Sequence, residues 1–199
     1  MSDIAVQPLD APVHQHRSRL LEGMARAVAQ KGYAETTIAD IVREASVSRR
    51  TFYEHFASKA ECLVALYQAA SRNALKVLRQ AIDPAHDWEE QVDRAIGAYL
   101  GSMAANPVLM RTLFIEILNL GPEGLAARRK VNREIADYML AVVNDAATQK
   151  RVTPELAMAV VGGIHELVLQ AIEDGRVTEL QQITATASAL VKAVAHRAP

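Results

Sequence analysis

Apolar residues recur at three- and four-residue spacing along most of the chain, and no run of β-branched residues alternates with polar ones. This period is typical of amphipathic α-helices and not of strands. We therefore predict an all-α fold with nine helices. Their expected ranges are 15–31, 37–45, 48–56, 58–82, 87–105, 107–119, 122–149, 153–174 and 179–196.

Capping chemistry supports these boundaries. A side-chain oxygen that accepts from the free N–H groups of a first turn favours a helix start. Four segments have the required spacing: Thr37 to Asp40, Ser58 to Glu61, Asp87 to Glu90 and Thr178 to Gln181. Proline at positions 107, 122 and 154 adds three starts, since a first helical residue needs no N–H. Gly32 and Gly175 indicate helix ends.

Composition and charge narrow the class of protein. A chain of 199 residues with 50% hydrophobic residues can bury a sizeable core. The net charge of -1 gives no global basic field, so a nucleic-acid surface would have to be local. The segment 14–60 has eight Lys and Arg against five acidic residues, which fits a local basic surface.

Targeting and metal signals are missing from the sequence. A single cysteine, Cys62, excludes an intramolecular disulfide framework and a cysteine zinc cluster. The N-terminal residues include Asp3 and Asp10 where a signal peptide needs basic and then apolar residues. We expect a soluble cytoplasmic protein with no membrane association, metal or cofactor.

The two short helices at 37–45 and 48–56 have the pattern of a helix-turn-helix. Ile38, Ile41 and Val42 form the apolar stripe of the first helix. In the second, Phe52 and Phe56 lie one turn apart and predict its buried face. The other face carries Arg49, Arg50 and Tyr53, which suits a helix that presents donors to a DNA groove.

These residues resemble the TetR/AcrR family of helix-turn-helix transcriptional regulators. The resemblance rests on TTIADIVREASVS at 36–48 and TFYEHFASK at 51–59. It implies a nine-helix fold with a DNA-binding domain at 14–57 and a ligand-binding and dimerisation domain at 58–199. It also implies a homodimer on a double-stranded DNA operator, with repression as the usual outcome. Residues 1–13 contain two prolines and no helical periodicity, which predicts a disordered arm before these domains.

Roles for individual residues follow from the same resemblance. Thr37 would cap its helix and touch a phosphate. Arg49, Arg50 and Thr51 would face base edges, which arginine can read with paired hydrogen bonds. Tyr53, His55 and Lys59 would hold the DNA backbone. The complete predicted DNA-binding set is Thr37, Ser48, Arg49, Arg50, Thr51, Tyr53, His55 and Lys59.

Two positions depart from the pattern. Ser46 stands in the turn where the family commonly has glycine, so a left-handed conformation there would cost about 1 kcal/mol. Glu54 adds an acid to the recognition helix. It would either accept a hydrogen bond from cytosine or point away from the DNA.

The helix at 107–119 is apolar around most of its circumference, which indicates a central position in the larger domain. Such a helix is either plain core or the wall of a cavity for a mostly apolar small molecule, and methionines are adaptable lining. The candidate ligand-binding residues are Tyr67, Trp88, Tyr99, Met103, Met110, Phe114, Glu116, Met139 and His165.

The last two helices predict the dimer interface. Gly162 and Gly163 lie inside an apolar helix, where each glycine costs about 1 kcal/mol relative to alanine unless helices approach closely. The final helix carries Ala185, Ala189 and Ala193 at similar spacing. We expect the helices 153–174 and 179–196 to pair with their twins around a twofold axis.

Two other classes of protein remain as alternatives. An enzyme would need a motif such as a phosphate-binding glycine loop or a His-Glu-x-x-His helix, and neither is present. If the protein were an enzyme, the candidate catalytic residues would be His14, His16 and the His165-Glu166 pair. A DNA-binding protein that responds to a protein partner would instead have a filled or absent cavity.

Overall fold

A computed structural model of the chain describes residues 11–144 and 152–197, and within these ranges it contains nine α-helices, two 3-10 helices and no strand. The all-α prediction is confirmed. In chain order the elements are α1 Ala11–Glu35, α2 Ile38–Ala45, α3 Arg49–His55, α4 Lys59–Ala81, α5 Trp88–Ala104, α6 Pro107–Phe114, η1 Glu116–Leu120, α7 Pro122–Val143, α8 Pro154–Glu173, η2 Val177–Ile183 and α9 Thr184–Arg197.

Most helices begin and end within a few residues of the expected positions. In α1 the regular helix is interrupted at Gly32, whose φ of 78° and ψ of 165° are not helical. The expected helix 107–119 divides into α6 and η1, and the expected helix 179–196 divides into η2 and α9. Residues 145–149 of the expected helix 122–149, and residues 1–10 of the expected arm, lie outside the described residues.

The first turn of α7 packs closely against η1. Gly124, in the first turn of α7, has no space for a side chain, because a Cβ there would overlap the carbonyl of Ile117 in η1. The chain therefore folds back closely onto η1 before α7 begins. The periodicity of the sequence contains no sign of this contact between η1 and α7.

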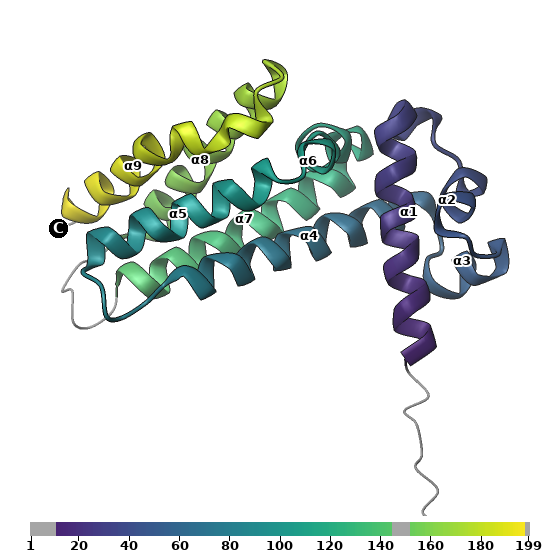
Figure 1. Ribbon diagram of the computed structural model, residues 1–199, viewed down its shortest axis with the longest axis horizontal. Coiled ribbons are helices and arrows are strands. Elements are labelled where there is room, and N and C mark those ends of the chain that lie inside the picture. Colours follow the sequence, from purple (N-terminus) through teal and green to yellow (C-terminus); the bar gives the residue numbers. More distant parts are fainter. Residues whose placement is uncertain (1–10, 145–151, 198–199) are drawn as a thin grey trace, which may run out of the picture. The chain divides into compact units, whose positions relative to one another are not determined.

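Contacts divide the chain after Leu66, within α4, into an N-terminal unit and a unit that starts at Tyr67. In the N-terminal unit α1 packs against α2 and α3 (Figure 1). The fully buried side chains at its centre come from all four helices and include Leu20, Ile41, Phe52 and Leu63. This core fixes the angle between α2 and α3.

The second unit is a bundle in which α7 packs on α8, and α5 packs on α9 and η2 (Figure 1). Its fully buried residues include Leu100, Ile117, Val168 and Leu180. Among the described helices, α8 alone is long and apolar enough to cross a membrane by length and composition. A core helix of a soluble protein meets the same criterion, and α8 contributes Val160, Val161, Ile164 and Val168 to this core.

Candidate nucleic-acid interface and effector cavity

The turn between α2 and α3 is left-handed at Ser46, which the sequence alone left open. Ser46 has φ 51° and ψ 49°, and it is the one non-glycine residue with positive φ among the described residues. Its N–H donates to the Arg43 carbonyl, and its own carbonyl accepts from Arg19 at 2.6 Å. The turn is therefore fixed to α1 as well as to α2.

Replacing Ser46 with glycine is expected to stabilise the N-terminal unit by up to about 1 kcal/mol, because glycine adopts this conformation without steric cost. The gain is limited because glycine also gives the unfolded chain more freedom. Urea unfolding of the two proteins, followed by circular dichroism, measures the difference. An alanine variant should be no more stable than serine, and a destabilised glycine variant would contradict the assigned strain.

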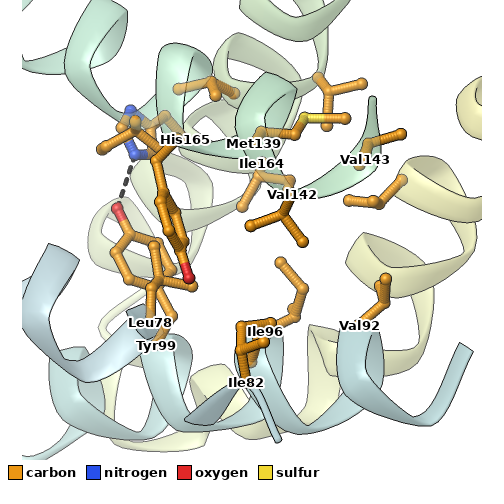
Figure 2. A pocket seen from close by; sticks show the side chains of 16 residues that line it. Leu78, Ile82, Val92, Ile96, Tyr99, Met139, Val142, Val143, Ile164 and His165 are labelled. Carbon is orange, nitrogen blue, oxygen red and sulfur yellow. Dashed lines mark hydrogen bonds between the residues drawn. The ribbon is translucent and has the colours of Figure 1, made fainter. Parts of the chain in front are cut away.

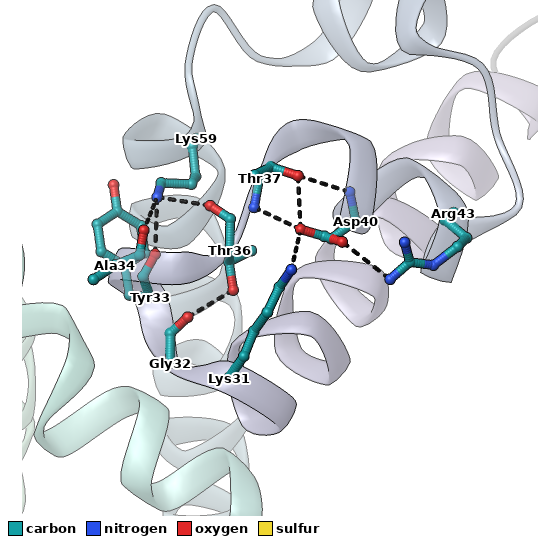
Figure 3. A network of polar contacts seen from close by, with 9 residues as sticks. All are labelled: Lys31, Gly32, Tyr33, Ala34, Thr36, Thr37, Asp40, Arg43 and Lys59. Atoms are coloured by element: carbon teal, nitrogen blue, oxygen red, sulfur yellow. Dashed lines mark hydrogen bonds and ion pairs between the residues drawn. The ribbon is translucent and has the colours of Figure 1, made fainter.

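Asp40 is the centre of a polar network that holds the start of α2 (Figure 3). Thr37 and Asp40 form a complete capping box, in which the Asp40 N–H donates to Thr37 Oγ1 and the Thr37 N–H donates to Asp40 Oδ2 at 2.9 Å. Lys31 Nζ lies 2.5 Å from the same carboxylate, and Arg43 pairs with Oδ1 at 3.0 Å. The hydrogen bond from Lys31, followed by those from Thr37, holds the pKa of Asp40 well below its usual range. The carboxylate therefore stays charged and joins α1 to α2.

Helix α3 presents one face to the core and the other to solvent. Ser48 caps it, accepting a 3.0 Å hydrogen bond from the Thr51 N–H. Phe52 is fully buried, and its ring lies against Phe56 with centroids 5.8 Å apart. Arg49 and Arg50 are exposed, and Tyr53 is 58% exposed despite its large ring. A cation-rich, aromatic face on a short capped helix suits contact with a DNA groove.

Glu54 pairs with Arg50 along this exposed face. Arg50 Nε donates to Glu54 Oε1 at 3.1 Å, one helical turn away. The Arg50 side chain is 89% exposed, so the pair is weak and open to exchange. The sequence left two roles open for Glu54, and this contact adds a third, which is to orient Arg50 before DNA binds.

Lys59 faces the end of α1. Its ammonium donates to the carbonyls of Tyr33 and Thr36 at 2.8 Å each, and more weakly to that of Ala34 at 3.4 Å (Figure 3). It also lies 4.2 Å from the centre of the Tyr33 ring. These contacts favour a positioning role, because all three N–H groups have acceptors inside the protein. A phosphate contact, as predicted from the sequence, would have to replace the weakest of them, to Ala34.

His55 and Thr51 are half-buried at the edge of the exposed face. Burial, followed by the nearby charge of His16, lowers the pKa of His55 below its usual value. His55 is therefore neutral at pH 7, and its predicted contact with the DNA backbone would be a hydrogen bond and not an ion pair. The structure brings all eight predicted DNA-binding residues into the N-terminal unit, where α2, α3 and the start of α4 carry them.

Two small cavities, each of about 90 Å³, lie in the second unit. The first is almost wholly apolar and is lined by α4, α5, α7, α8 and α9 (Figure 2). The second is bordered by α4, α5, α6, α7 and α8 and includes polar side chains: Ser71, Asn73, Ser102 and Asn106. Both are smaller than an engineered apolar cavity of roughly 150 Å³ that binds benzene.

Tyr99 and His165 border both cavities. The Tyr99 hydroxyl and His165 Nε2 are 2.9 Å apart in a hydrogen bond, and both residues are at least 95% buried. Burial, and then the charge of Arg128, lowers the pKa of His165 to about 4, so the ring is neutral at pH 7. Figure 2 shows the pair at one end of the first cavity, with Val92 and Val143 at the other.

Most of the ligand-binding candidates lie on these cavities. Met139 borders the first and Tyr99 and His165 border both, whereas four others border the second: Tyr67, Met103, Met110 and Phe114. Trp88 and Glu116 border neither. Trp88 packs against His196 of α9, and Glu116 accepts a hydrogen bond from Asn119 within η1. Glu116 lies in η1 and not in α6, so the periodicity of one continuous helix does not describe its position.

The polar residues of the second cavity were missed by the sequence analysis. Ser71 and Asn73 lie on α4, and Ser102 and Asn106 lie near the end of α5. Asn106 precedes Pro107 but makes no side-chain cap for α6. In the sequence, Asn106-Pro107 indicates only a helix start. That Asn106 also borders the second cavity is apparent only from the packing of α4 and α5.

The capped helix pair, its left-handed turn and the exposed basic face of α3 define a helix-turn-helix protein. Residues 20–66 match the family described as "Bacterial regulatory proteins, tetR family". The sequence motif predicts this match, and the family model confirms the resemblance to the TetR family over these residues.

Relatives with known names agree with this assignment. The chain is 28% identical over 102 residues to the uncharacterized HTH-type transcriptional regulator YxbF of Bacillus subtilis, covering 51% of this chain and 27% of that protein. It is 27% identical over 123 residues to the HTH-type transcriptional activator FasR of Mycolicibacterium smegmatis, covering 62% and 56%. The matched region thus spans between about a quarter and about half of these relatives' lengths.

Solved structures share the fold over almost the whole chain. The fatty acid degradation regulator FadR from Bacillus halodurans superposes with a TM-score of 0.77 at 17% identity, covering 87% of this chain and 96% of that one. FadR from Bacillus subtilis, solved in complex with stearoyl-CoA, gives 0.76 at 14% identity with the same coverage. At this identity the likeness establishes the TetR-like fold of the helical body.

Proposed function

We propose that this protein is a dimeric transcriptional regulator of the cytoplasm that reads a pseudo-palindromic DNA site with α3 and responds to a mostly apolar small molecule. The observation that carries the proposal is the exposed face of α3, where Arg49, Arg50 and Tyr53 point away from the buried Phe52. Two copies of α3 related by a twofold axis would enter major grooves about one helical turn, or a multiple of it, apart.

Replacing Arg50 with alanine is expected to relax base preference at one position of each half-site and to weaken binding by about 1 to 3 kcal/mol. The reason is that a bidentate contact to guanine has no substitute in alanine. Fluorescence anisotropy with the preferred duplex and with single-base variants measures both effects.

The matched control for Arg50 is Arg94→Ala on α5. Arg94 also forms a surface ion pair one turn away, with Glu90 at 3.8 Å, but lies in the second unit. It should leave affinity and base preference unchanged. Equal losses for Arg50→Ala and Arg94→Ala, or unchanged discrimination in Arg50→Ala, would contradict the role proposed for α3.

The dimer is proposed to form through α8 and α9. Gly163 has its absent Cβ 3.3 Å from Leu190, so it serves the approach of α9 within one chain. Gly162 faces open space, with nothing within 4 Å of a Cβ placed there. The exposed residues near it on α8 and α9 include the apolar or small residues Leu156, Ala159, Ala185, Ala189 and Ala193, together with Glu166 one turn along α8. A second copy of the same face would cover them.

Effector binding is proposed to change operator affinity by altering the distance between the two DNA-binding units of the dimer. The coupling free energy between effector and operator binding should be about 1 to 3 kcal/mol. We propose repression as the default outcome, although FasR is named an activator. The alternative is that the protein responds to a protein partner and not to a small molecule. The small volume of each cavity, about 90 Å³, favours this alternative. Direct ligand titrations, described below, separate the two.

A further inference from the structure

We infer that the Tyr99–His165 hydrogen bond is an internal gate between two halves of one effector site, and that the effector is an uncharged amphipathic molecule. This inference rests on the proposed ligand response. The two cavities share Tyr99, Ile135 and His165 as a common wall. Neither alone has room for a drug-sized ligand, which typically occupies roughly 300 Å³ or more. A ligand therefore has to open this wall.

The lining specifies the chemistry of each half. The first cavity offers aliphatic side chains apart from its two tyrosines and His165, and so suits a hydrocarbon group. The second offers hydroxyls and amides. Ser71 and Ser102 donate to carbonyls of their own helices, so their oxygens remain as acceptors, and Asn106 makes no helix cap. This half suits a neutral head such as an alcohol or an amide.

Charge is the discriminating feature. No Lys, Arg, Asp or Glu borders either cavity, and the His165 ring is neutral. A buried carboxylate would have no cation in contact with it, because Arg128 acts on His165 from outside both cavities. Transfer of an unpaired ion into such a site is far more costly than transfer of an alcohol.

The gate adds a requirement for a hydrogen-bonding group. Separating Tyr99 from His165 would leave two buried polar groups without partners, and each unsatisfied group carries a desolvation penalty. A ligand whose hydroxyl or amide hydrogen-bonds to both freed groups removes these penalties, because such a group can donate to one and accept from the other. A pure hydrocarbon does not.

The test is calorimetric titration of the full-length protein with octan-1-ol, octanamide and octanoate, without DNA. We expect the two neutral compounds to bind and octanoate to bind at least about 10-fold more weakly at pH 7. Octanoate that binds as well as octan-1-ol, or the absence of binding by both neutral compounds, would overturn the inference. Operator binding measured separately without ligand tests the proposed DNA-binding function, so the two failures are distinguishable.

Tyr99→Phe tests the gate itself. It removes one hydroxyl and frees His165 Nε2, so octan-1-ol should bind about 5-fold more tightly because no internal bond has to break. Tyr138→Phe is the matched control, since Tyr138 borders the first cavity but makes its recorded contact with Arg79, outside the cavity. Equal affinities of the two variants for octan-1-ol would rule out the gate.

Discussion

Replacing Gly162 with glutamate is expected to convert the protein into monomers and to reduce operator affinity by about 100-fold or more. The glutamate fits within one chain, because open space surrounds the Cβ position. In a dimer, the twofold axis would bring two added carboxylates into the interface, where each would lose solvation without a cation to pair with. A monomer has only one DNA-binding unit, so it loses the gain in affinity from bivalent binding, which is about 10²- to 10⁴-fold.

Sedimentation analysis and anisotropy with a two-half-site duplex measure these effects. Gly162→Ala is the matched control, since it adds a Cβ in the same space without charge and should keep the dimer. A glutamate variant that stays dimeric would show that α8 does not form the interface at this point.

Replacing Phe52 with alanine is expected to lower the free energy of unfolding of the N-terminal unit by about 3 to 5 kcal/mol and to abolish DNA binding. Phe52 is fully buried and contacts the rings of Tyr53 and Phe56. The chain has one tryptophan, Trp88, in the second unit. Its fluorescence should therefore follow the second unit in urea, while circular dichroism reports helix loss in both.

Tyr53→Ala is the comparison for this variant. Tyr53 is the next residue of the same helix but is mostly exposed, so its stability should change by no more than about 0.5 kcal/mol while DNA affinity falls. Equal destabilisation by the two variants would mean that Tyr53, and not only Phe52, supports the core.

Local chemistry explains what the sequence could predict. Thr37, Ser58 and Asp87 act as helix caps through contacts within three residues, so their spacing alone identifies them. The fourth expected cap, Thr178, is wrong, because Thr178 lies inside η2. The resemblance places Ser46 in the turn, and the structure adds that its backbone is left-handed. The buried face of α3 follows from the spacing of Phe52 and Phe56.

Contacts between distant segments could not be predicted in this way. Lys31 reaches Asp40 from another helix, and Lys59 reaches the carbonyls of Tyr33 and Thr36 across more than 20 residues. Spacing along one helix contains no information about such partners. The same limit explains why Trp88 and Glu116 were wrongly predicted to line a cavity. The sequence does not show that α9 packs against Trp88 or that α6 ends before Glu116.

Selection of binding sites from random duplex DNA by the wild-type protein is the most direct test of the central claim. We expect enrichment of a pseudo-palindrome in which the two half-sites are separated by about 10 base pairs or a simple multiple of that distance. We also expect that the affinity for the selected site falls steeply with salt, as phosphate contacts require. Enrichment of no common sequence, or of a single unrepeated half-site bound by one chain, would contradict this claim.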